Sequence, residues 1–338
     1  MFDFIYIEEA ISNHPRVRKI CSRFPNATQI SCTRYGEIFN PRSQDFRLQK
    51  KRPALILASK HGRLVLEAPP EYGIGGEPNY YFSHMLNCVY DCRYCFLQGM
   101  YRSANMVIFV NYEDFQVALE EKILAAAPGQ SPYFFSGYDC DSLAMEATTR
   151  FVSSFRDFFA AHPRAFFELR TKSVRITDLL TSDALPNCIV AFSMTPPLVA
   201  AALEAGTPPV QRRLGAMQQL QEHGWPVGLR FDPLILHENY QEHYAQLFAT
   251  VFARLNIEHL HSVSLGQFRL PRDHYKTMSQ LYPDEKLFAH ALEEKKGMVS
   301  YQTQRAREMH DFCARELLRY IPPSLFFPCP SSTLEVCN

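Results

Sequence analysis

The chain has 338 residues, 46% of them hydrophobic, and its 35 basic and 35 acidic residues give a formal net charge of zero. This length allows one barrel-sized domain or two smaller ones. No apolar run approaches the length of a membrane span, and the first residues lack the pattern of a secretory signal. We therefore expect a cytoplasmic globular protein, with no membrane partner, whose ten cysteines are thiols or metal ligands rather than disulfides.

The N-terminal part shows little regular pattern up to residue 52 and ends in a basic run at residues 47–52. Such a run is typical of a solvated surface, and a phosphate-binding patch is the alternative. Two short strands are predicted next, at residues 54–58 and 64–68, and the intervening His61-Gly62 predicts a hairpin-like turn between them.

Residues 88–95 place three cysteines, Cys88, Cys92 and Cys95, at C-x3-C-x2-C spacing. Thiolates this close in sequence suit an iron–sulfur cluster or zinc, and they suit magnesium or calcium badly. A closed zinc or cubane site needs a fourth ligand, so three protein ligands leave one iron open to a small molecule. The aromatic Tyr94 beside the last cysteine favours the cluster because it can exclude water. Zinc held with His84, four residues upstream, is the alternative.

After the cysteines, predicted strands alternate with predicted helices over about 160 residues, a pattern typical of parallel β/α units. The alternation predicts an α/β fold, either a barrel or a doubly wound sheet. Helices are expected from residue 272 to 320, and a proline-rich tail with Cys329 and Cys337 follows. The strands are predicted at residues 106–111, 133–135, 165–170, 188–193, 227–236 and 259–265, and the helices at 112–126, 142–161, 174–180, 196–222 with a break at 206–209, and 238–255.

Polar residues follow the ends of these predicted strands, where a parallel barrel carries its chemistry. For any one of them, helix capping is a sufficient explanation, as for Asp141 before the helix at 142–161. The whole set together with the cysteines instead favours an open metal cluster beside a charged small molecule. The set is Ser136, Asp139, Cys140, Asp141, Arg170, Lys172, Ser193, Arg230, Asp232, Gln267 and Arg269.

The cysteine spacing followed by strand–helix alternation resembles the radical SAM superfamily. Shorter blocks narrow the resemblance to the spore photoproduct lyase family, and the similarity covers most of residues 1–320. It implies a partial (β/α)6 radical SAM barrel at residues 81–270, an N-terminal extension at 1–80 that packs on the barrel, and a C-terminal helical extension and tail at 271–338. The blocks are residues 88–98, 107–114, 166–180, 191–207 and 229–233.

The resemblance implies a radical SAM lyase. In the family, three cysteines hold a [4Fe–4S] cluster, and S-adenosylmethionine binds the open iron and is cleaved to a 5′-deoxyadenosyl radical after one-electron reduction. The implied substrate is a thymine photolesion in ultraviolet-damaged DNA, and the implied electron source is an external reductant such as flavodoxin or ferredoxin. A lysine beside the cofactor carboxylate makes a charge-assisted contact. The positions matching cofactor contacts are Tyr94, Cys140, Asp141, Lys172 and Ser193.

The chain departs from the family where hydrogen is returned to the product radical. An ungapped alignment of residues 133–149 puts Tyr138 at the hydrogen-donating cysteine, while Cys140 falls on a serine that contacts the cofactor. Phe96 replaces a tyrosine that relays radicals in the family. Both S–H and O–H bonds are weak enough to quench a carbon radical, so Cys140 and Tyr138 are the candidate catalytic residues, with Cys140 preferred. A small buried residue is the alternative interpretation of Cys140.

Two other functions stay open at this point. One is a radical SAM enzyme acting on a nucleotide, RNA or peptide, and the other is a non-catalytic module holding zinc or an electron-transfer cluster. Binding to DNA requires basic residues near the barrel mouth despite the zero net charge. The candidates are Arg47, Lys50, Lys51, Arg52, Arg269, Arg272, Lys276, Lys295 and Lys296.

Overall fold

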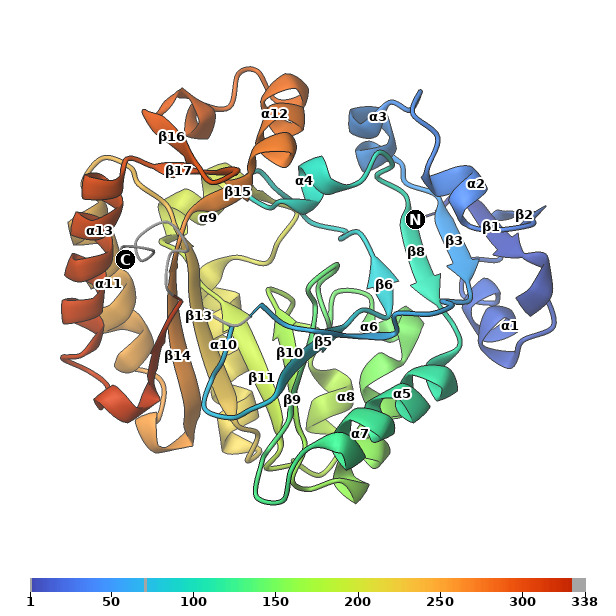
Figure 1. The fold of residues 1–338 in the computed structure, drawn as a ribbon, viewed down its shortest axis with the longest axis horizontal. Helices are drawn as coiled ribbons and strands as arrows, with labels where there is room; N and C mark the ends of the chain where they lie inside the picture. The colour runs from blue at the N-terminus through green and yellow to red at the C-terminus, as the bar shows by residue number, and fades with distance from the viewer. Residues whose placement is uncertain (1, 70–71, 330–338) are drawn as a thin grey trace.

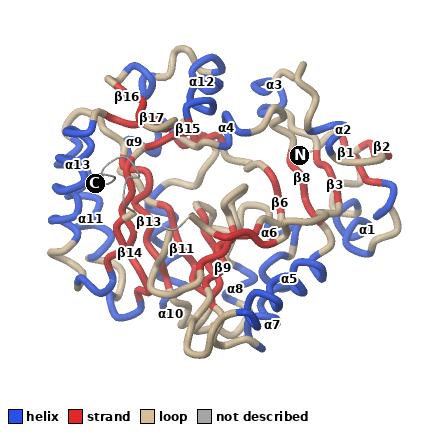
Figure 2. Tube along the Cα trace, viewed as in Figure 1, coloured by secondary structure: helices blue, strands red, loops and turns tan. Residues whose placement is uncertain are grey.

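The structure is a computed structural model that describes residues 2–69 and 72–329. Its largest sheet has eight strands, and every neighbouring pair is parallel except β4 with β5. The sheet curls around a central space (Figures 1 and 2), which confirms the predicted α/β partial barrel. In spatial order the strands are β4 (Val65–Glu67), β5 (Asn79–Phe82), β9 (Tyr133–Ser136), β10 (Phe166–Thr171), β11 (Cys188–Ser193), β13 (Val227–Leu234), β14 (Leu260–Gln267) and β18 (Phe326–Pro328).

Helices cover the outer face of this sheet (Figure 1). In α7, Phe151, Phe155 and Phe159 recur every fourth residue, so they lie on one face of the helix and are buried. Phe159 stacks on Phe167 of β10 with 4.5 Å between ring centroids. The covering helices are α5 (Tyr112–Ala125), α7 (Phe151–Ala161), α8 (Thr177–Leu180), α10 (Val210–Glu222), α11 (Tyr240–Phe252) and α13 (Thr303–Leu317).

A second, five-stranded sheet is built mostly from the N-terminal part, in the order β2–β1–β3–β8–β6. Its pairs are parallel except β6 with β8. Regular structure therefore begins well before residue 52, contrary to the sequence prediction. The elements are β1 (Phe4–Glu8), α1 (Pro15–Cys21), β2 (Thr28–Cys32), α2 (Gly36–Phe39), α3 (Phe46–Lys51), β3 (Leu55–Ala58), β6 (Met85–Leu86) and β8 (Met106–Phe109).

The predicted hairpin at residues 54–68 is wrong, because its two strands belong to different sheets. β3 pairs with β1 and β8 in the small sheet, whereas β4 pairs with β5 in the large one. All four residues of β3 are buried, as expected of a strand covered on both faces of a parallel sheet. The strand predicted at residues 106–111 forms β8, which also belongs to the small sheet and not to the barrel.

Two predicted helical regions are interrupted. The helix expected at 142–161 is divided into α6 (Glu146–Thr149) and α7 by Arg150, which has a positive φ of 52°. Within the helical region expected from 272, α12 (Arg272–Leu281) is followed by a hairpin of β16 (Leu292–Lys295) and β17 (Met298–Tyr301), which pairs with β15 (Arg269–Pro271). Its two-residue turn, residues 296–297, has positive φ at both positions, as a type I′ turn requires.

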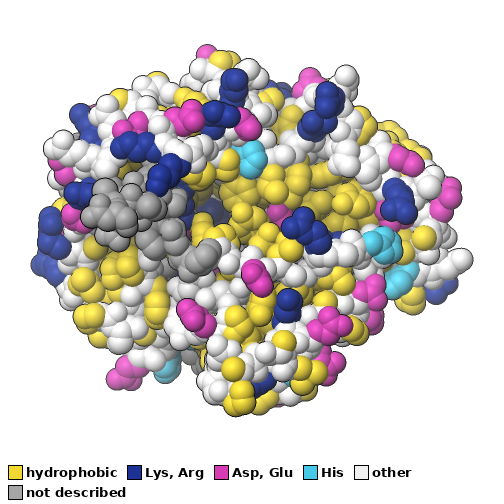
Figure 3. Space-filling model, in the orientation of Figure 1, with side chains coloured by type: hydrophobic (Ala, Val, Ile, Leu, Met, Phe, Trp, Pro, Cys, Tyr) yellow, Lys and Arg dark blue, Asp and Glu magenta, His cyan; other side chains and the backbone are white. Residues whose placement is uncertain are grey.

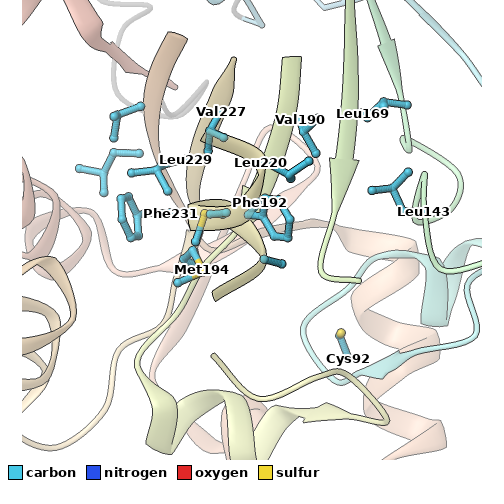
Figure 4. Packing of buried hydrophobic residues seen from close by; sticks show 14 of the residues in the cluster. Cys92, Leu143, Leu169, Val190, Phe192, Met194, Leu220, Val227, Leu229 and Phe231 are labelled. Carbon is cyan, nitrogen blue, oxygen red and sulfur yellow. The ribbon is translucent and has the colours of Figure 1, made fainter. Parts of the chain in front are cut away.

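The main hydrophobic core lies between the large sheet and its covering helices. Phe192, Leu229 and Phe231 are fully buried within it, and Cys92 of the cysteine segment belongs to the same cluster (Figure 4). In the described part of the chain, no helix is long and apolar enough to cross a membrane. Domain boundaries after residues 80 and 270 remain our proposal, with β6 and β8 reaching from the middle part into the small sheet.

Candidate active site

The cysteine segment lies between β6 and α4 (Leu97–Met100), and it is held to the barrel by a short antiparallel pairing. Within it, β7 (Asp91–Cys92) pairs with β12 (Glu204–Ala205), which directly follows α9 (Pro197–Leu203) and precedes the predicted break at 206–209 before α10. Figure 1 shows α4 on the side of the central space where the strands of the large sheet end. The segment is therefore fixed at the mouth of the partial barrel.

Hydrogen bonds bring the three predicted ligands onto one tight loop. The N–H of Cys95 donates to the carbonyl oxygen of Cys92 at 3.0 Å, and the N–H of Tyr90 donates to Sγ of Cys88 at 3.4 Å. Lys50, a predicted phosphate ligand, instead donates from Nζ to the carbonyl oxygen of Cys88 at 2.7 Å. Three thiols thus share one loop that is anchored from two sides.

The chemistry of this loop fits a metal cluster. Burial raises the pKa of all three thiols, that of Cys88 to about 12, so the thiolates need a compensating positive charge, which iron supplies. Among the described residues, no three Cys, His, Asp or Glu side chains are already arranged around one point as metal ligands. The fit therefore rests on the donor set and on the loop that carries it.

His84 does not take part in the site. Its side chain is 1% exposed, and its ring stacks on Phe151 with 3.7 Å between centroids. Neither ring nitrogen has a hydrogen-bond partner in the described structure, and burial lowers the pKa of His84 to about 3. A zinc site closed by His84 is therefore not what the structure shows.

Tyr94 is held by a buried charged network that the sequence did not reveal. Its hydroxyl donates to the carboxylate of Glu204, and the guanidinium of Arg213 donates to the same carboxylate. The side chains of Glu204 and Arg213 are fully buried. Arg213 also donates to the carbonyl oxygen of Ser193 at 3.1 Å, which ties the network to the end of β11. The only sequence signal would have been two charged residues flanking the Gly-Pro break in a helical pattern.

Lys172 follows the end of β10 and faces this network. Its Nζ lies 5.5 Å from the ring centroid of Tyr94. Burial lowers the pKa of Lys172, but the nearby Glu204 and Cys92 raise it by more, so the net pKa is raised and the ammonium stays charged. The structure thus brings Tyr94, Lys172, Ser193 and the cysteine loop together, and their binding of a cofactor stays a prediction.

The carboxylate of Asp141 holds two neighbouring segments of the site in place through hydrogen bonds. One carboxylate oxygen accepts from the N–H of Lys172 at 2.7 Å, and the other accepts from the hydroxyl of Thr171 at 2.6 Å. The second oxygen also accepts from the N–H groups of Leu143 and Ala144. Asp141 therefore joins the loop after β9 to the end of β10, and it makes the capping contacts that were its alternative interpretation.

The two candidate hydrogen donors lie in different surroundings. Tyr138 is 38% exposed, and its ring centroid is 4.6 Å from that of Tyr81 and 5.3 Å from that of Phe96 in the cysteine segment. Cys140 is 5% exposed and packs in the core of the small sheet with residues such as Met85. The face in Figure 3 is hollowed at its centre, and much of the visible lining is hydrophobic.

A pair of arginines flanks one carboxylate at the strand ends. Arg170 and Arg269 lie 3.4 Å and 3.5 Å from the carboxylate of Asp232, and Arg269 also donates to the hydroxyl of Tyr72 at 2.7 Å. Burial raises the pKa of Asp232, but the two arginines lower it by more, so the carboxylate stays ionised. Two cations against one anion leave a positive charge that suits an anionic ligand.

Two other residues that were predicted at the barrel mouth, Arg230 and Gln267, instead make contacts that stabilise the fold. Arg230 is buried in an ion pair with Glu168 at 2.6 Å, and the side chain of Gln267 donates to the carbonyl oxygen of Ala306 at 2.9 Å. These two side chains do not belong to the mouth of the barrel, contrary to the sequence prediction.

Some of the basic residues that were predicted to bind phosphate form ion pairs with acidic neighbours. Arg52 pairs with Asp3 at 2.7 Å, and Lys295 pairs with Glu293 at 2.9 Å. Arg272 pairs with Glu294 at 3.5 Å. The candidates that are exposed and have no ion pair among the described residues are Arg47, Lys51, Lys276 and Lys296.

Comparison with known proteins agrees with this geometry. The sequence model of spore photoproduct lyase matches residues 76–325. The chain is 24% identical over 203 residues to spore photoproduct lyase of Bacillus subtilis, an alignment that covers 59% of each chain and so spans less than two thirds of that protein. It is 23% identical over 248 residues to the protein of the same name from a Geobacillus species, covering 70% of this chain and 72% of the relative.

Solved structures of spore photoproduct lyase variants share the fold. One variant has a TM-score of 0.85 at 19% identity, and a second, with bound AdoMet and dinucleoside spore photoproduct, has a TM-score of 0.84 at 18% identity. Each alignment covers 98% of both chains. Because the family model matches well over half of the sequence, the chain belongs to the spore photoproduct lyase family, as its cysteine motif and neighbouring blocks predicted.

Proposed function

We propose that this protein is a radical SAM lyase that repairs a thymine photolesion in DNA. The observation that carries the proposal is the loop of Cys88, Cys92 and Cys95, fixed at the barrel mouth beside the charged Lys172 in a chain of this family. A [4Fe–4S] cluster on the three thiolates, with S-adenosylmethionine on the open iron, would supply a 5′-deoxyadenosyl radical after one-electron reduction.

The cofactor-side residues have distinct roles in this proposal. Lys172 binds the carboxylate of S-adenosylmethionine, since its ammonium stays charged although it is partly buried. Tyr94 and Ser193 flank the cofactor, and the network of Glu204 and Arg213 holds Tyr94 in place. Asp141 orients the backbone that carries Lys172.

The substrate side is formed by the aromatic residues at the opening. Tyr81, Tyr138 and Phe96 offer stacking faces for the joined bases, and Arg170 with Arg269 offers positive charge for a phosphate. A related structure holds dinucleoside spore photoproduct, which supports a DNA lesion as the substrate.

Two residues are candidates for returning a hydrogen atom to the product radical, and their surroundings differ. The exposure of Tyr138 beside Phe96 supports Tyr138 as the donor, because the donor must reach a substrate. Cys140, preferred on sequence grounds, would need the loop after β9 to rearrange before its buried thiol reached the opening.

We further propose a cytoplasmic location and an external one-electron reductant such as flavodoxin or ferredoxin. All nine cysteines in the described part are free thiols, which suits a reducing compartment.

The test is an anaerobic assay of the reconstituted protein with dithionite, S-adenosylmethionine and an oligonucleotide carrying a defined thymine photolesion. We expect a broad blue-region absorption band, 5′-deoxyadenosine and restored thymine. A colourless protein with stoichiometric zinc contradicts the enzyme assignment. Cofactor cleavage without any turnover of damaged DNA would instead point to a nucleotide, RNA or peptide substrate.

A further inference from the structure

A cavity of about 810 Å³ opens beside the cysteine loop and is lined by segments far apart in the sequence. It receives Arg23 from the turn after α1, Arg150 from the break before α7, Arg175 from the loop after β10 and Arg212 from α10. Val89 and Tyr90 from the cysteine segment also line it. None of the aromatic residues at the substrate opening, Tyr81, Tyr138 or Phe96, lines this cavity.

The cavity gives a short path from the protein surface to the predicted cluster. Val89 directly follows Cys88 and is 39% exposed, whereas the other residues of the loop are buried or partly buried. The N–H of Tyr90 donates to Sγ of Cys88. One side of the loop therefore contacts the cavity through Val89 and Tyr90, next to Cys88 in the sequence.

The cavity is positively charged although the chain is neutral overall. All four arginines are exposed, and within the described residues only Arg150 has an ion-pair partner, Asp178 at 3.1 Å. The one other acidic residue in the lining, Glu146, is buried, and burial raises its pKa to about 8, so it is largely protonated at neutral pH. Unpaired cations from separate elements around one opening fit a complementary acidic surface.

We propose that this arginine-lined cavity is the docking site for an acidic one-electron-transfer protein that reduces the cluster. The inference rests on the proposed function, because only a cluster on the cysteine loop needs this electron. One electron leaves the reduced donor and enters the cluster, with no bond made or broken and no proton moved at this site. The exposed Val89 is where the donor's surface would come nearest to Cys88.

The test is charge reversal at two unpaired arginines, Arg175→Glu with Arg212→Glu, in the holoenzyme. The probe is flavodoxin, an acidic protein, and its binding is measured at several salt concentrations. We expect binding about tenfold weaker or worse, with a flatter salt dependence, because steering charges have been inverted. The rate of 5′-deoxyadenosine formation with reduced flavodoxin should fall in parallel, while the rate with dithionite should stay unchanged. Arg175→Gln with Arg212→Gln should give an intermediate loss.

The matched control is Arg305→Glu with Arg307→Glu on α13, two exposed arginines on the far side of the barrel from α6 and α8 (Figure 1). This variant should bind flavodoxin as the unmodified protein does. Unchanged flavodoxin binding in the Arg175 and Arg212 variant overturns the inference. So does a loss of DNA binding with flavodoxin binding intact, which would make the cavity a phosphate site. Absence of dithionite-driven cleavage in the unmodified protein contradicts the proposed function itself.

Discussion

The two sides of the barrel mouth are built in different ways. On the cofactor side, Tyr94 is locked by the fully buried pair of Glu204 and Arg213. On the substrate side, Tyr138 is partly exposed, and its hydroxyl has no hydrogen-bond partner among the described residues. Tyr94, Lys172 and Ser193 on the cofactor side match positions of the family by sequence, whereas Tyr138 and Phe96 on the substrate side depart from the family pattern. In the proposed function, radical generation would therefore take place beside a buried, hydrogen-bonded frame, whereas the substrate radical would be handled at a more exposed surface.

Loss of a cluster ligand should have the largest effect. Cys92→Ala removes one of three thiolates from the loop, so the cluster should be labile or absent and formation of 5′-deoxyadenosine should be abolished. Iron and sulfide content together with the cleavage assay measure this. Cys88→Ala and Cys95→Ala should behave in the same way.

The control for this prediction is Cys188→Ala, which removes a thiol buried in β11 and remote from the loop. Cys313→Ala on α13 is a second control. Both variants should keep iron and activity. A Cys92→Ala protein with full iron content and normal cleavage would remove the cluster assignment.

Breaking the buried ion pair should have the next largest effect. Arg213→Met leaves the Glu204 carboxylate buried without its cation, and such changes cost about 3–5 kcal/mol of unfolding free energy. Urea denaturation measures this loss of unfolding free energy. The matched control is Glu113→Gln, which breaks the more exposed pair with Arg16 and should cost about 1 kcal/mol or less.

The double variant Glu204→Gln with Arg213→Met sharpens this prediction. It removes both charges and keeps an amide oxygen as acceptor for the hydroxyl of Tyr94. Because neither partner is left as an uncompensated charge, its cost should be well below the sum of the two single variants. Additive costs would show that the pair does not act as one unit.

Glu146, at the start of α6 in the lining of the arginine cavity, should make the stability of the protein depend on pH. Its buried carboxylate accepts from the N–H of Val152 at 3.0 Å, and it faces Asp178 and Arg150. Burial raises the pKa to about 8 in the folded protein, above its value of 4.5 in the unfolded chain. Between these values the folded state holds a proton that the unfolded state has lost. Stability therefore falls as pH rises through this window, by at most about 1.4 kcal/mol per pH unit.

Urea denaturation of Glu146→Gln at several pH values from 5 to 8 checks this. The amide cannot ionise, so the variant should gain stability relative to the unmodified protein as pH rises. Glu121→Gln, an exposed substitution on α5, serves as the control. Parallel pH curves for the Glu146→Gln and unmodified proteins would contradict the prediction.

The sequence predicted the local features of the site and missed those that depend on tertiary pairing. The cysteine ligands could be found because their spacing lies within one loop, and Lys172 could be found because it follows a strand. Glu204 and Arg213 flank the Gly-Pro break in a helical pattern, but nothing in the sequence indicates that they pair with each other. The apolar run of β8 was assigned correctly as a strand but to the wrong sheet, because a buried run carries no information about its neighbours.

The smallest effects, and the sharpest test of the comparison, concern Tyr138 and Cys140. Tyr138→Phe removes one partly exposed hydroxyl, so the unfolding free energy should change by about 0.5 kcal/mol or less. Formation of 5′-deoxyadenosine should stay normal, while the yield of restored thymine should fall severalfold and abortive products should accumulate, because the product radical loses its hydrogen donor. Cys140→Ala should give the reverse pattern. It should cost about 1 kcal/mol, because the thiol fills space in the core of the small sheet, and it should leave the products unchanged. Product analysis by mass spectrometry in deuterated solvent gives a readout that a purely structural role would not move, since an exchangeable O–H or S–H donor delivers deuterium to the thymine. If Cys140→Ala alone loses the deuterium label, the buried thiol reaches the substrate after all, and the substrate side is more mobile than its packing indicates.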